Sequence, residues 1–307
     1  IKTGFEQSEI FADSKLFYSD AACCLEEIIY NETGFQKSFF TSSKLDCYEI
    51  LNRIIKLHIQ KNQKTGILTT SGIIKYFSDT KISKNIIPLN YLGVAKSLIS
   101  KHIGTVIVEL IQIDEEITIA DPCYLKELSS ICKSNNTLLV VDTSEISPYR
   151  LLNGLFNFDI NIKPDIIIAS KGFSNGIPFG TVCIADKSLV MDIDDIKYGT
   201  VNLAYSIVSN FIKNSSMKDF QNIIKSNADY ITKRLNELAE SHISILNIEN
   251  YGMLYTIDVD FSAYELTKEL FNNGIIVEAL NSSTIKLSPP YFISKEEIDK
   301  FVNTMDK

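Results

Sequence analysis

One lysine follows an apolar stretch and begins a glycine-rich turn. Lys171 comes directly after residues 164–170, which end in Ile-Ile-Ile-Ala-Ser, and before residues 172–180, which contain three glycines. An amine in such a place is suited to covalent chemistry, because desolvation lowers its pKa and an uncharged amine can attack an aldehyde. A lysine that ends a strand and extends into water produces the same Lys-Gly pair, so the pair alone does not separate the two interpretations.

An aspartate ends a second apolar stretch upstream. Residues 138–142 read Leu-Leu-Val-Val-Asp, and stretches that are apolar at every position are typical of central parallel strands buried on both faces. Ligands of open α/β sheets lie beyond the carboxyl ends of such strands, where Asp142 and Lys171 are both expected. Pyridoxal phosphate needs this pair: a lysine that holds its aldehyde and an acid that keeps its pyridine nitrogen protonated.

Length, charge and cysteine usage exclude several classes of function. The 307 residues allow one large or two modest domains. The net charge of −8 argues against a nucleic-acid surface, and no apolar run reaches the roughly 20 residues of a membrane span. No signal-peptide pattern is found at the start. The six cysteines form no Cys-x-x-Cys pair and only three histidines are present, which predicts no metal site and fits a reducing, cytoplasmic compartment.

Alternating strands and helices predict an α/β fold with a mostly parallel central sheet and helices on both faces. After residue 217 the pattern changes to that of a smaller α+β domain, which ends in a helix with a capping box from Ser294 to Glu297. Strands are expected at 38–41, 66–70, 105–111, 138–142, 164–170, 179–184, 243–247, 253–259, 275–278 and 284–287, and helices at 20–37, 44–60, 122–134, 217–240 and 262–273.

The turn at residues 40–46 connects a short strand to a helix. Ser42 and Ser43 are suitable N-cap residues, and the unpaired backbone N–H groups at a helix start can bind phosphate. An ordinary capped helix explains this segment equally well.

Together, these segments resemble the class III aminotransferases, the fold-type I pyridoxal-phosphate family that includes acetylornithine and ornithine aminotransferases. The resemblance is clearest in residues 105–182, where Asp142 follows Glu109 by 33 positions and Lys171 follows Asp142 by 29. It implies the fold of the fold-type I pyridoxal-phosphate transferases. The domains it implies are an N-terminal helical segment (1–36) that lacks the family's own N-terminus, a large cofactor-binding domain (37–215) and a small C-terminal α+β domain (216–307).

The resemblance also implies roles for individual residues. Lys171 would hold the cofactor aldehyde and move the proton of the substrate Cα, and Asp142 would pair with the pyridine nitrogen. Other residues implied at the cofactor are Ser43, Lys44 and Leu45 at its phosphate, Ser144 and Glu145 beside its ring, and Thr200 near the phosphate of a neighbouring subunit. Residues implied at the substrate are Lys75, Glu109 and Lys286.

Several positions depart from the family pattern. Lys44 stands where the family has a glycine, and it could bind phosphate directly. Lysine also replaces arginine at Lys75 and Lys286, which keeps the charge but loses the bidentate fork for carboxylates. Glu145 replaces an amide, and the aromatic residue that stacks on the cofactor is absent from residues 72–75.

The function implied by the resemblance is transfer of an amino group from an ornithine-like donor to a 2-oxo acid such as 2-oxoglutarate. Such an enzyme of amino-acid metabolism is expected to be a cytoplasmic homodimer. The alternative is a catalytically degenerate homologue that acts as a pyridoxal-phosphate-binding, partner or regulatory protein.

Overall fold

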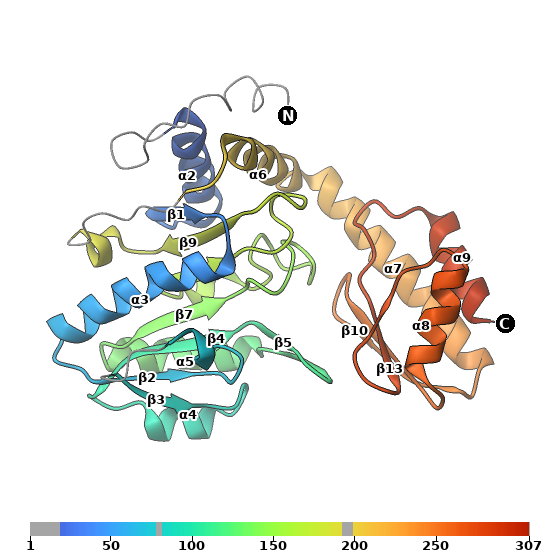
Figure 1. Ribbon diagram of the computed structural model, residues 1–307, viewed down its shortest axis with the longest axis horizontal. Coiled ribbons are helices and arrows are strands. Elements are labelled where there is room, and N and C mark those ends of the chain that lie inside the picture. The colour runs from blue at the N-terminus through green and yellow to red at the C-terminus, as the bar shows by residue number, and fades with distance from the viewer. Residues whose placement is uncertain (1–18, 78–81, 192–198, 307) are drawn as a thin grey trace. The chain divides into compact units, whose positions relative to one another are not determined.

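The computed structural model describes residues 19–77, 82–191 and 199–306, which form two compact units (Figure 1). The large unit holds the described residues up to 112, together with 118–148 and 158–213. The small unit holds 113–117, 149–157 and the described residues from 214 onward. The domain boundaries expected from the sequence stay a prediction, and part of the 1–36 segment lies outside the described residues.

A seven-stranded sheet forms the centre of the described part of the large unit. Its strands lie in the order β1-β9-β8-β7-β4-β2-β3. The five strands from β8 to β3 are parallel, whereas β9 runs antiparallel to both β8 and β1. The mostly parallel sheet predicted from the sequence is therefore confirmed. The bounds are β1 Lys37–Thr41, β2 Gly66–Thr69, β3 Ser83–Ile86, β4 Ile103–Glu109, β7 Leu138–Asp142, β8 Ile166–Ala169 and β9 Gly180–Ile184.

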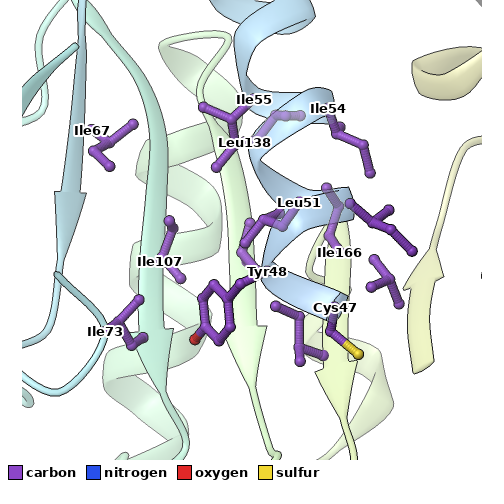
Figure 2. Close-up of a cluster of buried hydrophobic side chains, with 14 of the residues drawn as sticks. Cys47, Tyr48, Leu51, Ile54, Ile55, Ile67, Ile73, Ile107, Leu138 and Ile166 are labelled. Carbon is purple, nitrogen blue, oxygen red and sulfur yellow. The ribbon is translucent and has the colours of Figure 1, made fainter. Parts of the chain in front are cut away.

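Helices pack on the two faces of this sheet. Helix α3 (Lys44–Lys61) lies in front of it in Figure 1 and α5 (Pro122–Ser134) lies behind it. Figure 2 shows side chains of α3, such as Tyr48 and Leu51, directed at strand residues such as Ile107. Further helices in the described part of this unit are α2 (Asp20–Thr33), α4 (Leu92–Leu98) and α6 (Asn202–Ser215), with short 3-10 turns at η1 (Ile74–Tyr76), η2 (Ile160–Ile162) and η3 (Lys187–Val190).

The first four residues of strand β7, 138–141, are all apolar because they are buried on both faces of the sheet. Leu138 and Val140 belong to the core cluster beneath α3. Leu139 and Val141 are equally buried, but alternation along a strand turns them to the opposite face. Burial on both faces excludes the polar residues that an exposed face would carry, as expected for a central parallel strand.

The small unit contains an antiparallel sheet in the order β10-β11-β13-β12 within its described residues. Its helices bury apolar side chains against this sheet, and the predicted capping box between Ser294 and Glu297 is present at the last of them. The bounds are α7 Lys218–Ser241, β10 Ile245–Asn250, β11 Tyr255–Val259, α8 Ala263–Asn272, β12 Glu278–Ala279, β13 Thr284–Leu287 and α9 Lys295–Met305.

Some elements have no strong sequence signal and were not expected. Strand β3 is mostly exposed and polar, and helix α4 has only seven residues. Strands β5 (Ile111–Ile113) and β6 (Ile117–Ile119) form a separate two-stranded sheet. Within the described ranges, each helix is too short or too polar to cross a membrane.

Candidate active site

Parallel strand pairing brings three predicted site residues to one edge of the large sheet. Glu109 ends β4 and Asp142 ends β7, and the two residues are direct partners in the register. Asp142 in turn pairs with Ile168 of β8, three positions before Lys171. Because parallel strands end on the same side of a sheet, these residues share the edge where ligands of open α/β sheets bind.

Asp142 is buried and receives hydrogen bonds on both carboxylate oxygens. Its exposed fraction is 3%. Oδ1 accepts a bond from the backbone N–H of Ser144 at 2.7 Å, and Oδ2 accepts one from the hydroxyl of Tyr48 at 2.5 Å. Burial and the charge of Asp142 raise the pKa of Tyr48 well above 10. Tyr48 therefore stays protonated and serves as a permanent donor to the acid.

Lys44 turns toward two carboxylates. Its Nζ lies 2.5 Å from Oε1 of Glu145 and 3.6 Å from Oδ2 of Asp142. Burial lowers the pKa of Lys44, but the two carboxylates outweigh burial and the pKa ends above its usual 10.5. Burial likewise raises the pKa of Glu145, and the ammonium of Lys44 outweighs it, so this pKa falls below 4.5. Both groups are therefore charged near neutral pH.

The site contains two tyrosines that the sequence analysis did not single out. Tyr48 and Tyr76 are stacked, with ring centroids 4.1 Å apart and an interplanar angle of 12°. The Nζ of Lys44 lies 5.6 Å from the Tyr76 centroid, and Asn52 donates to the Tyr76 carbonyl. Lys44, Tyr48 and Asn52 are spaced four residues apart, which places them on one face of α3. The spacing of these three polar residues in the sequence could therefore have predicted that they lie together on the face of α3 directed at the site.

Lys171 lies in an exposed turn, as in the second of the two interpretations of the Lys-Gly pair. Strand β8 already ends at Ala169, and the Lys171 backbone N–H donates to the Ser144 carbonyl at 3.3 Å. Gly172 follows with a φ of +80°, and a Cβ there would lie 2.2 Å from Oγ of Ser147. The turn therefore depends on glycine both for its backbone angle and for space.

The start of α3 lies beside strand β9. Ser43 caps the helix, as predicted, by accepting a bond from the Asp46 N–H at 3.2 Å, and Leu45 is exposed. A Cβ at Gly180 would lie 2.7 Å from Sγ of Cys47 in α3 and 2.9 Å from the carbonyl oxygen of Ser43, the N-cap of that helix. The absence of a side chain at Gly180 thus lets the backbone of β9 approach the first turn of this helix.

Thr200 lies near the same helix start within its own chain. Its Oγ1 donates to the Pro178 carbonyl at 2.7 Å, and its N–H donates to the Tyr205 hydroxyl at 3.2 Å. Ser42 donates to the carbonyl of Gly199 at 2.9 Å. The segment around Thr200 is therefore attached to the candidate phosphate turn.

Glu109 is buried among neutral donors. Its Oε2 accepts bonds from Oγ1 of Thr70 and Nε2 of Gln112, each at 2.8 Å. A Cβ at Gly72 would lie 2.4 Å from its Oε1, so the backbone covers it closely. Lys75 is exposed and its Nζ lies 5.4 Å from the centroid of Tyr76.

Lys286 belongs to the small unit. Its Nζ lies 2.5 Å from Oε2 of Glu278, its direct cross-strand partner. The ammonium that the resemblance assigns to a substrate carboxylate therefore already pairs with a carboxylate of its own sheet.

Ser144 provides the test of whether this corner fits a polar ligand. Its Oγ is buried and has no hydrogen-bond partner among the described residues. Buried hydroxyl groups are nearly always hydrogen-bonded, since an unpaired one destabilises the fold. A polar group bound against Ser144 would supply the partner. Together with the buried acid Asp142 and the capped start of α3, this chemistry fits a cofactor such as pyridoxal phosphate.

Comparison with known proteins identifies the family. A model of the family "Aminotransferase class-III" matches residues 56–307. The chain belongs to the class III aminotransferases. This family consists of pyridoxal-phosphate-dependent transaminases, so the family resemblance noted in the sequence is confirmed.

Two relatives show how far the similarity extends. The acetylornithine aminotransferase of Methanocaldococcus jannaschii is 24% identical over 227 residues, which cover 72% of this chain and 56% of that protein. The acetylornithine aminotransferase of Clostridium acetobutylicum is 24% identical over an alignment of 327 positions, gaps included, which covers 98% of this chain and 84% of that protein. The chain thus spans little more than half of the first relative and most of the second.

A solved structure shows the same fold. The acetylornithine aminotransferase of Elizabethkingia anophelis superposes with a TM-score of 0.83 at 19% identity, over 99% of this chain and 83% of that one. The predicted fold of the fold-type I pyridoxal-phosphate transferases is therefore confirmed.

Proposed function

We propose that this chain is a pyridoxal-phosphate-dependent transaminase that moves an amino group from an ornithine-like donor to a 2-oxo acid such as 2-oxoglutarate. Membership of the class III family supports the reaction type, and the acetylornithine aminotransferases among its relatives suggest the donor class. The observation that carries the proposal is the shared strand edge of Asp142 and Lys171, with the unpartnered hydroxyl of Ser144 between them in the chain.

Each residue has a defined task in this proposal. Bound pyridoxal phosphate supplies an electron-withdrawing pyridine ring. Asp142 would hold the proton on the ring nitrogen, and Lys171 would bind the aldehyde carbon through Nζ and carry the proton of the substrate Cα. Ser144 Oγ would gain a hydrogen-bond partner. The phosphate would be received by the Ser43 hydroxyl and the first backbone N–H groups of α3, those of Lys44 and Leu45.

The substrate residues form the next part of the proposal. Lys75 is exposed beside Tyr76 and can reach a carboxylate as a point charge. Glu109 would act in donor binding through its buried carboxylate. Lys286 would bind a substrate carboxylate only after its ion pair with Glu278 is broken.

A borohydride experiment tests the cofactor part. The protein is purified with pyridoxal phosphate, reduced with borohydride, digested and analysed by mass spectrometry. We expect a stable cofactor label on Lys171 that disappears in Lys171→Ala and persists in Lys187→Ala, a matched exposed lysine on η3. An equal spread of label over surface lysines in the wild type and in Lys171→Ala would contradict the proposal.

An amino-donor experiment tests the reaction. Acetylornithine or ornithine is added to the reconstituted protein while the visible absorption of the cofactor is followed, and 2-oxoglutarate is then added. We expect a donor-dependent loss of the original band and its return with the 2-oxo acid. A band that no donor changes would favour the alternative, a protein that binds the cofactor without transamination.

Assembly and location complete the proposal. We propose a cytoplasmic homodimer, since the scattered cysteines fit a reducing compartment and sites of this family lie between subunits. Light scattering at high concentration is the measurement, and a monomer there would contradict the dimer.

A further inference from the structure

We infer that Lys44 competes with the cofactor for Asp142: its ammonium pairs with this acid in the cofactor-free chain and must leave it before a cofactor can use it. The inference rests on the proposed function, because it concerns the acid assigned to the cofactor's ring nitrogen. It gives Lys44 a role different from the phosphate contact expected from the sequence.

The first argument is the direction of the Lys44 side chain. The residue occupies the first turn of α3, where a phosphate-binding lysine would extend toward the helix start. It points instead to the strand edge, and its Nζ lies 3.6 Å from Oδ2 of Asp142. The side chain is only 20% exposed, so it fills space beside the acid rather than extending into water.

The second argument is the limited capacity of Asp142. One of its oxygens accepts from the Ser144 N–H and the other from the Tyr48 hydroxyl, and the Lys44 ammonium adds a full positive charge at that second oxygen. A protonated ring nitrogen bound to Asp142 would be a second cation at the same place. Two positive charges held by the same carboxylate would be direct neighbours, and they would repel each other strongly because the Asp142 side chain is buried. The Lys44 ammonium and the ring nitrogen therefore cannot both occupy Asp142.

The third argument is that Lys44 has a second ion-pair partner, Glu145, which it can keep after it leaves Asp142. Glu145 lies 2.5 Å from Nζ and its side chain is 44% exposed, against 1% for Asp142. The lysine can therefore turn outward with Glu145 without losing its ion pair. Glu145 thereby acts as a positioning residue, which explains a carboxylate where the resemblance leads one to expect an amide.

Cofactor titrations test the inference. The dissociation constant of pyridoxal phosphate is measured by tyrosine fluorescence for the wild type, Lys44→Ala and Lys44→Gln. If Lys44 leaves Asp142 in about one molecule in ten, its removal should tighten binding about tenfold. Lys44→Gln keeps the length of the side chain without its charge and guards against a packing defect in Lys44→Ala.

Lys75→Ala is the matched control. Its Nζ lies at a similar distance from the Tyr76 ring, 5.4 Å against 5.6 Å for Lys44, but no ion pair of Lys75 with Asp142 is present among the described residues. Removing a cation near an anionic ligand weakens binding or leaves it unchanged. Tighter binding in the Lys44 variants alone therefore identifies competition, because general electrostatics gives the opposite sign.

Four outcomes separate this inference from the proposed function. If the wild type is labelled at Lys171 and the Lys44 variants bind more tightly, both stand. If the wild type is labelled but the Lys44 variants bind equally or more weakly, the inference is overturned and the proposed function stands. If only the Lys44 variants are labelled, Lys44 excludes the cofactor, so the inference stands and the proposed function fails. If none is labelled, both are overturned.

Discussion

The surroundings of Asp142 and of Lys171 differ although the two residues share one sheet edge. We call Lys44, Tyr48, Tyr76, Asp142 and Glu145 the acid cluster. In this cluster the carboxylate of Asp142 is buried, and it is held by the Tyr48 hydroxyl, a backbone N–H and the Lys44 ammonium.

The lysine turn, residues 170–180, is its counterpart. There Lys171 is exposed, and the backbone around Gly172 rather than burial fixes its position. The comparison shows two ways to place a residue at one sheet edge. The carboxylate of Asp142 is held by its hydrogen-bond partners, whereas Lys171 is placed by the backbone of its turn.

The largest expected effect concerns the lysine turn. Gly172→Ala should destabilise the protein by about 3 kcal/mol, because alanine is strained at a φ of +80° and its Cβ would lie 2.2 Å from the Ser147 Oγ. Gly176→Ala is the matched control in the same turn, with a φ of +92° and open space around its Cβ. It should destabilise the protein by only about 1 kcal/mol. Urea unfolding measures both, and equal losses would show that the contact with Ser147 is unimportant.

The next effect concerns the acid cluster. Tyr48→Phe should lower the free energy of unfolding by about 2 kcal/mol, because Asp142 loses a hydrogen bond to a buried charge. Tyr124→Phe is the control, since the buried Tyr124 hydroxyl has no hydrogen-bond partner in the described part of the chain. Its removal should be neutral or stabilising. A loss in Tyr124→Phe as large as in Tyr48→Phe would mean that the bond to Asp142 is not the cause.

The smallest effect is the pH dependence of the Lys44 ion pair. The pKa of Glu145 lies below 4.5 in the folded chain, so its pairing stabilises the fold above that pH and is lost as the pH falls through the folded value. The pKa of Lys44 lies above 10.5, so the pairing is also lost above that pH. Lys44→Gln should therefore be less stable than the wild type by about 1 kcal/mol at pH 7, a modest value because Glu145 is 44% exposed.

Urea unfolding across the pH range checks this window. The difference between the wild type and Lys44→Gln should shrink as the pH falls below 4.5. Lys75→Gln, which removes an exposed ammonium beside the same Tyr76 ring, should show a much smaller difference at pH 7. A difference for Lys44→Gln that is constant with pH would rule out the ion pair as its source.

The sequence predicted the features that local chemistry determines. The apolar run that ends at Asp142 indicated a strand buried on both faces, and the helix caps at Ser43 and Ser294 were correct because capping depends on residues only three positions apart. The strand edge shared by Asp142 and Lys171 followed from the parallel order of the strands.

The contacts that long side chains make could not be predicted in the same way, because they depend on the packed structure. Lys44 can reach either the helix start or the strand edge, and only the packed structure shows that it turns to Asp142 and Glu145. The ion pair of Lys286 with Glu278 depends on the pairing of β12 with β13, which no local pattern specifies. The exposure of Lys171 likewise depends on where β8 ends.

The unpartnered hydroxyl of Ser144 makes the stability of this chain a report on what lies beside it. An oxygen buried without a partner destabilises the fold, so Ser144→Ala should stabilise a chain that binds nothing there. A ligand that pairs with the hydroxyl would reverse the sign, because Ser144→Ala would then remove a hydrogen bond.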